Sequence, residues 1–120
     1  MSTASLLFVT IDANDADAVA AFWAAFLGTE IDSVFDDGRF VFLKGRDGLP
    51  VLCIQRVPEP KAGKVRIHLD LGVDDLEAAT RRVEELGGAW DGQERTLDPF
   101  VWRTMTDPEG NEFDVALVTG

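Results

Sequence analysis

A single histidine, His68, is the only side chain of this sequence whose ordinary pKa lies near neutral pH. An imidazole can bind a metal ion, but the facial-triad centre of many metalloenzymes needs two histidines and a carboxylate. The chain cannot supply that set from its own residues. Three roles stay open for His68: a metal ligand, a general acid or base, or an imidazole held by hydrogen bonds in a cleft or core.

A carboxylate, Asp114, interrupts the apolar segment FDVALV near the end of the chain. Side chains alternate along a strand, so Asp114 should share a face with Glu112 and Ala116 and lie opposite Phe113 and Val115. The first of these faces carries both polar and apolar side chains, and the second is apolar. The mixed face either meets water or lines a cleft.

The only cysteine, Cys53, has the same strand parity as Gln55, so both should point to one face. One cysteine cannot form an internal disulfide, which agrees with a reducing compartment. No partner histidine can be assigned to it from the sequence. A buried, inert thiol is therefore expected in preference to a reactive nucleophile.

Aromatic side chains recur in alternating pairs. Phe40 and Phe42 share one expected strand face, and Phe100 and Trp102 share another. These faces either line an apolar pocket that holds a planar ligand or belong to an ordinary core. Arg103 should lie opposite Trp102, where pairing with a surface carboxylate is favoured over binding an acidic ligand.

The elements that position these residues occur twice. The segment from Phe8 reads FVTIDANDADAVAAFWAAFLG, and the segment from His68 reads HLDLGVDDLEAATRRVEELGG. The offset is 60 residues from Phe8 to His68, and the same from Asp15 to Asp75 and from Gly28 to Gly88. Each copy predicts a strand, a turn, an amphipathic helix and a glycine stop.

Module one is predicted over residues 5–57, a Pro- and Gly-containing linker over 58–64, and module two over 65–118, all within one domain of residues 1–120. Asn14 or Asp15 is the expected N-cap of the first helix, and Asp74 with Glu77 has capping-box spacing for the second. Residues 92–98 form a polar loop without an assigned structure. The expected strands span residues 6–11, 30–35, 40–44, 51–57, 65–71, 89–91, 100–106 and 112–118.

The composition excludes several classes of function. A formal net charge of −11 disfavours binding to nucleic acid or to an anionic membrane surface. No apolar stretch reaches the length of about 20 residues that a membrane span needs. The N-terminal residues lack the basic and apolar regions of a signal peptide, so a cytoplasmic location is expected.

Three passages resemble the vicinal oxygen chelate superfamily, which includes glyoxalases, bleomycin-resistance proteins and extradiol dioxygenases, and in particular its glyoxalase-like subgroup. They are AFWAAFLG at 21–28, RIHLDLGVDDLEAA at 66–79 and DPEGNEFDV at 107–115. The resemblance implies an α+β fold of two tandem βαβββ modules, which form one pseudo-symmetric domain whose curved mixed sheets surround a cleft. It also implies a homodimer, for which aromatic residues such as Trp23 and Trp102 would suit the interface.

In many members of that superfamily a divalent metal is held by residues of the first and last strands of each module. The resemblance places Phe8 and His68 at the first-strand positions and Asp114 at the last-strand position of module two. The last-strand position of module one falls near Cys53 or Gln55. Because Phe8 cannot bind a metal, His68, Asp114 and Gln55 make a poor set for zinc, nickel or ferrous iron.

Three functions follow as hypotheses. The first is a protein that binds a small organic molecule in an aromatic cleft without a tightly bound metal, with His68 and Asp114 as candidate catalytic residues. Its ligand would contact the seven residues Phe8, Phe40, Phe42, Cys53, Gln55, Phe100 and Trp102. The second is a divalent-metal-dependent lyase, isomerase or thiol transferase. The third is a non-catalytic dimeric domain with a vestigial site.

Overall fold

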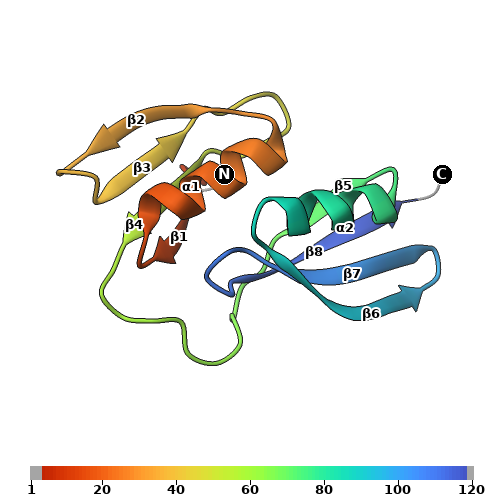
Figure 1. Cartoon of the computed structure of the whole chain (residues 1–120). Coiled ribbons are helices and arrows are strands. Elements are labelled where there is room, and N and C mark those ends of the chain that lie inside the picture. Colours follow the sequence, from red (N-terminus) through yellow and green to blue (C-terminus); the bar gives the residue numbers. More distant parts are fainter. Residues whose placement is uncertain (1–3, 119–120) are drawn as a thin grey trace. The chain divides into compact units, whose positions relative to one another are not determined.

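The computed structural model describes residues 4–118 and consists of two helices and eight strands within that range (Figure 1). The chain divides into two compact units, Met1–Pro60 and Lys61–Gly120. Their boundary lies inside the predicted linker. Each unit has the predicted βαβββ order, which confirms an α+β fold built from two repeated modules.

The first unit contains a four-stranded sheet in the order β1-β4-β3-β2. The first and last strands, β1 and β4, run parallel, whereas the other neighbours are antiparallel, so the sheet is mixed as predicted. The helix contacts all four strands. The elements are β1 (Val9–Ala13), α1 (Ala16–Leu27), β2 (Ile31–Phe35), β3 (Phe40–Leu43) and β4 (Leu52–Arg56).

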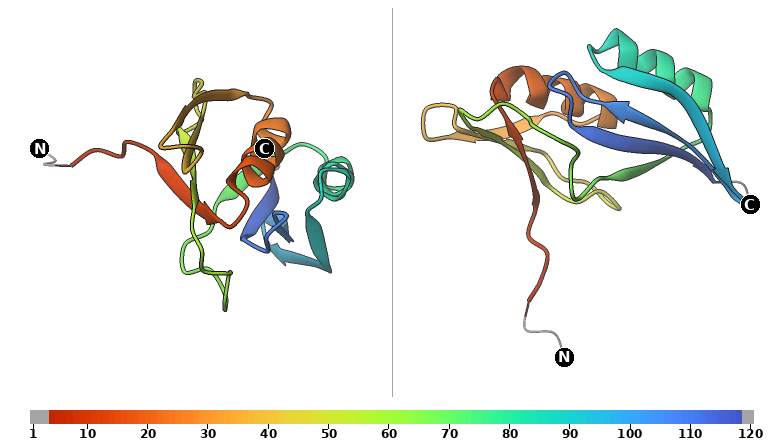
Figure 2. Two further views of the ribbon diagram at one scale, coloured as in Figure 1. Left: turned by 60° about the vertical axis from the view of Figure 1, so that its left-hand side comes forward. Right: turned by 90° about the horizontal axis from the view of Figure 1, so that it is seen from below.

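The second unit repeats this topology with the strand order β5-β8-β7-β6. Its first and last strands, β5 and β8, are again the parallel pair. The two views of Figure 2 show α2 lying along one face of the strands of this unit. The elements are β5 (Asp70–Val73), α2 (Leu76–Glu85), β6 (Ala89–Leu97), β7 (Phe100–Thr106) and β8 (Glu112–Val118).

The 60-residue repeat is clearest at the helix N-caps. The Asp15 carboxylate accepts a hydrogen bond from the Ala18 N–H (3.1 Å), and Asp75 does the same for Ala78 (3.0 Å). The predicted cap at Asp74 is therefore wrong by one residue, because the cap must directly precede the first helical residue. At the other end of α1, Gly28 adopts the left-handed conformation that terminates the helix, as predicted.

The strands that open the two units begin later than predicted. The expected strand over 6–11 is β1 at Val9–Ala13, and the expected strand over 65–71 is β5 at Asp70–Val73. Apolar residues precede each strand, but ladder pairing starts only where β4 or β8 lies alongside. As a result, Phe8 and His68 precede their strands rather than lie within them.

The polar segment over 92–98 is largely a strand, since β6 extends from Ala89 to Leu97. A register shift between Trp90 and Glu94 interrupts its pairing with β7, and Gly92 there has a φ of 85°. β6 is an edge strand, so its polar side chains remain in contact with water. This exposure explains why the hydrophobic pattern did not indicate a strand.

Each helix buries its apolar side against its own sheet. Trp23, on α1, is 1% exposed, which assigns it to the core and makes it unavailable for the expected dimer interface. In the second unit Val83 of α2 lies with Met105, Phe113 and Val115 among the fully buried side chains. Neither described helix is long and apolar enough to cross a membrane.

A buried arginine joins α2 to the sheet of the second unit. Arg103 on β7 is 6% exposed, and its guanidinium donates to Glu77 (2.6 Å), Thr80 (2.9 Å) and Glu94 (3.1 Å). It also lies 4.2 Å from the centre of the Trp90 ring. The predicted pairing of Arg103 with carboxylates is confirmed. Glu77 therefore serves this ion pair and not a capping box.

Replacing Arg103 with methionine should lower the free energy of unfolding by about 1–3 kcal/mol, because several charge-assisted hydrogen bonds disappear together. Urea unfolding followed by circular dichroism measures the loss. Arg82→Met is the matched control, since Arg82 is exposed and its pair with Glu85 spans 3.5 Å. The control should change stability by about 0.5 kcal/mol or less. Equal losses in both variants would contradict the role assigned to Arg103.

Candidate functional site

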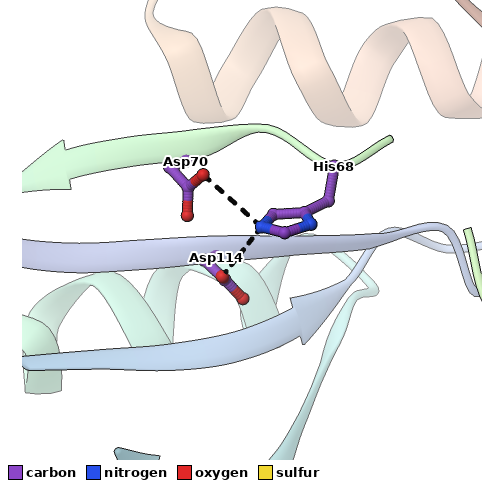
Figure 3. Close-up of side chains that lie close together, drawn as sticks. All are labelled: His68, Asp70 and Asp114. Atoms are coloured by element: carbon purple, nitrogen blue, oxygen red, sulfur yellow. Dashed lines mark ion pairs between the residues drawn. The ribbon is translucent and has the colours of Figure 1, made fainter. Parts of the chain in front are cut away.

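Three ionisable side chains converge in the second unit: His68, Asp70 and Asp114 (Figure 3). The His68 Nε2 atom lies 3.4 Å from Oδ2 of Asp70 and 3.3 Å from Oδ2 of Asp114. Figure 3 shows this nitrogen facing both carboxylates, while the other ring nitrogen points away from them. The side chain of Asp114 is 12% exposed, whereas those of His68 (41%) and Asp70 (63%) reach solvent.

The parallel pairing of β5 with β8 creates this cluster. Asp70 and Asp114 are direct partners in that register, so their side chains leave the same face of the sheet. The segment before β5, which carries His68, is tied to the start of β8 by Glu112. One oxygen of that carboxylate accepts from the Val65 N–H (2.9 Å), and the other pairs with Lys61 (2.5 Å).

The orientation of the Asp114 carboxylate is set from β7. The Thr104 hydroxyl donates to Oδ1 of Asp114 at 2.7 Å, which leaves Oδ2 directed toward His68. Arg95 in turn donates to the Thr104 oxygen at 3.5 Å. This arrangement holds the buried carboxylate in one orientation.

The two carboxylates of the cluster repel each other when both are ionised. Burial raises the pKa of Asp70 above its usual value, and the neighbouring Asp114 raises it further. His68 acts in the opposite direction but does not reverse the shift. The site thus holds more negative charge than its surroundings compensate.

A pocket of about 550 Å³ adjoins the cluster and is lined by residues of the second unit. Phe100 and Trp102 lie at alternate positions of β7, as predicted, and Trp102 is paired with Ala116 of β8. The pocket therefore combines an aromatic wall with the ionisable cluster. Its lining residues are His68, Asp70, Leu71, Gly72, Phe100, Trp102, Asp114 and Ala116.

The other sequence-predicted residues form a separate group in the first unit. The ring of Phe8 makes an edge-to-face contact with Phe42, with centroids 5.2 Å apart. Across β3 and β4, Phe42 is the partner of Cys53 and Phe40 is the partner of Gln55, so these four side chains share one sheet face. Gln55 thus lies among aromatic side chains of its own unit.

Cys53 is buried, as predicted, and burial raises the pKa of its thiol. A hydrogen bond with the side chain of Thr10 acts against that rise without cancelling it. A thiol with a raised pKa is a poor nucleophile at neutral pH.

The register of the two parallel pairs fixes which residues correspond between the units. Asp70 pairs with Asp114 in the second unit, and Thr10 pairs with Cys53 in the first. Cys53, and not Gln55, is therefore the counterpart of Asp114. The first unit has Phe8, Thr10 and Cys53 where the second has the histidine and the two carboxylates.

Sequence reasoning missed two residues of the site, Asp70 and Thr104. Asp70 follows His68 by two positions, which on a strand means the same face, and this spacing was a usable signal. Thr104 could not be found in this way, because its role depends on the register between β7 and β8.

The three side chains of the cluster could together hold a divalent ion. Ligand atoms bound to one ion at about 2.1 Å lie about 3.0–3.4 Å apart. The separations between His68 Nε2 and the two carboxylate oxygens, 3.4 and 3.3 Å, agree with that geometry. One imidazole and two carboxylates suit Mn²⁺, Fe²⁺ or Zn²⁺.

Comparison with known proteins gives a family and a fold. The model of the glyoxalase-like domain family matches residues 8–116. None of the curated proteins matches the chain.

Solved structures with the same fold include a glyoxalase/bleomycin resistance protein/dioxygenase family enzyme from Burkholderia phytofirmans (TM-score 0.79, 17% identity, 97% of this chain and 100% of that one). The fosfomycin resistance protein FosX from Listeria monocytogenes has a TM-score of 0.75 and 17% identity, over 98% and 96% of the two chains. Lactoylglutathione lyase from Agrobacterium tumefaciens has a TM-score of 0.64 and 22% identity, over 97% and 95%. These identities support a shared fold only.

The raised pKa of Asp70 predicts how stability depends on pH. A carboxyl whose pKa is higher in the folded than in the unfolded state favours folding below the unfolded value of 3.8. That contribution is lost as the pH rises through the folded value. Relative to Asp70→Asn, the wild type should therefore lose stability as the pH rises from about 3 to 7, by about 0.5 kcal/mol after solvent screening.

Urea unfolding of both proteins in EDTA across this range makes the comparison. Asp74→Asn controls for the loss of one negative charge, because Asp74 is exposed and lies outside the cluster. If the difference in unfolding free energy between Asp70→Asn and the wild type does not change with pH, the pKa of Asp70 is not raised in the folded protein.

Proposed function

The chain belongs to the glyoxalase-like domain family, and from that premise we propose that its second unit binds a small organic molecule in the pocket beside His68 and Asp114. The observation that carries the proposal is the joining of an aromatic wall and an imidazole–carboxylate pair in one pocket. A volume of about 550 Å³ lies within the range of small-molecule sites. Phe100 and Trp102 supply flat apolar surface for the body of the ligand.

His68 and Asp114 supply the chemistry of the proposed site. The imidazole can donate or accept a proton at its ring nitrogens, and the Asp114 carboxylate at 3.3 Å fixes its orientation. A ligand bound beside them would have an acid–base group within reach. On this proposal the two residues bind and orient the ligand and transfer a proton where a reaction occurs, without a tightly bound metal.

The second candidate is a metal-dependent enzyme, and the position of Asp70 favours it. His68, Asp70 and Asp114 are the residues that would hold a divalent ion beside the pocket. A bound ion supplies Lewis acidity, which polarises an oxygen of the substrate.

A fragment screen tests the proposed pocket. Gly72→Val should weaken binding, because an added Cβ at Gly72 meets no atom within 4 Å and the valine side chain would project into the pocket. Its backbone lies outside the left-handed region, so a β-branched residue fits the strand. Shifts of the Trp102 indole N–H in protein NMR spectra report the binding.

Ala89→Val on β6 is the control, since Ala89 is exposed and does not line the pocket. Fragments should bind this variant as they bind the wild type. Failure of every fragment to shift Trp102 would reject the pocket and favour the vestigial domain. Fragments that bind Gly72→Val unchanged would place the site elsewhere.

Metal content separates the two candidate functions. Protein purified without a polyhistidine tag should contain far less than one divalent ion per chain, and fragment binding should persist in EDTA. Elemental analysis and thermal shifts with Mn²⁺, Fe²⁺, Co²⁺, Ni²⁺ and Zn²⁺ give the measurement. Near-stoichiometric metal that disappears in both His68→Ala and Asp114→Ala would replace the first proposal by the second.

A further inference from the structure

The charges around the pocket are of one sign. Its ionisable lining residues are His68, Asp70 and Asp114, and no lysine or arginine of the described part of the chain lines it. With the imidazole neutral the lining carries two negative charges, and with it protonated one remains. Of the two carboxylates, Asp114 is the buried one, with 12% of its side chain exposed, so its charge is costly unless a positive group compensates it.

No cation of the neighbouring strands lines the pocket itself. Arg95 faces the same side of the sheet as Trp102, its partner in the β6–β7 register. Its guanidinium is held by Asp91 at 3.0 Å and by Gln93 at 3.2 Å. Lys61 pairs with Glu112, outside the pocket lining. Arg95 contacts Asp114 through the Thr104 hydroxyl, at 3.5 Å and 2.7 Å, but a cationic ligand would meet no lysine or arginine in the pocket lining itself.

The remaining wall suits a positive group as well. Phe100 and Trp102 present aromatic surface, and the faces of such rings attract cations. Asp114 is held by Thr104 and His68 with one oxygen directed to the cluster, so a ligand meets a carboxylate that is already oriented. Preorganisation of this kind reduces the entropy lost on binding.

We propose that the pocket of the second unit selects organic cations: molecules with an ammonium group and an apolar or aromatic body. The ammonium group lies at Asp70 and Asp114, and the body lies against Phe100 and Trp102. This inference rests on the proposed function, because it names the ligand class of the same pocket. The net charge of −11 adds a long-range attraction for such ligands.

Three probes of similar size and different charge test the selection: benzylammonium, benzyl alcohol and benzoate. Titrations at neutral pH in EDTA, followed by the Trp102 indole N–H, give three dissociation constants. Benzylammonium should bind about tenfold more tightly than benzyl alcohol, and benzoate more weakly than both. EDTA removes divalent ions that would compete for the carboxylates.

Asp114→Asn should reduce the preference for benzylammonium over benzyl alcohol to about threefold or less, because it removes charge but retains shape. Asp70→Asn should act in the same direction and serves as the second variant if Asp114→Asn does not fold. Asp74→Asn is the matched control: it removes an exposed carboxylate that does not line the pocket, and it should leave the preference unchanged.

Equal binding of benzylammonium and benzyl alcohol by the wild type would overturn the selection and leave the proposed pocket intact. A preference that survives both asparagine variants would also overturn it. Absence of binding by all three probes, with failure of the fragment screen, would overturn the proposed function together with the inference.

Discussion

The second unit depends on the parallel pairing of its first strand with its last. A parallel pair cannot be closed by a tight turn, so α2, β6 and β7 must all lie between β5 and β8 in the chain. That connection brings Asp70 and Asp114 into register, and it leaves His68 at the point where β5 is about to begin. The helix covers one face of the resulting sheet, and the pocket occupies the other.

The first unit has the same parallel pairing of its first and last strands, but the side chains that meet there are of other types. Its parallel pair, β1 and β4, places Thr10 beside Cys53, and Phe8 precedes the strand as His68 does in the second unit. The resulting face is aromatic and carries a buried thiol instead of a histidine between two carboxylates. A shared fold therefore fixes where side chains meet, whereas the residue types decide what they can bind.

Local sequence patterns predicted most of the fold, whereas some strand boundaries were set by the pairing between strands. The 60-residue repeat, the Gly28 stop and the boundaries of β7 and β8 follow from hydrophobic period and turn residues. The start of β5 and the extent of β6 do not follow from these local signals. Both boundaries are set by pairing with another strand, β8 for β5 and β7 for β6. His68 and Asp114 were named as candidates from residue type and resemblance, and the spacing of Asp70 from His68 would have added it, whereas Thr104 emerged only from the register between β7 and β8.

The alternation of side chains along β7 explains why Arg103 does not lie beside the carboxylates of the pocket. Arg103 points to the helix face, where Glu77, Thr80 and Glu94 saturate its guanidinium, whereas Trp102 and Thr104 point to the pocket face. A residue of β7 can serve only one face, so this buried cation cannot neutralise Asp114. Arg95 reaches the pocket face but is bound by Asp91. Arg103 and Arg95 thus join the helix and the edge strand to the sheet, and neither of them lines the pocket that holds Asp70 and Asp114.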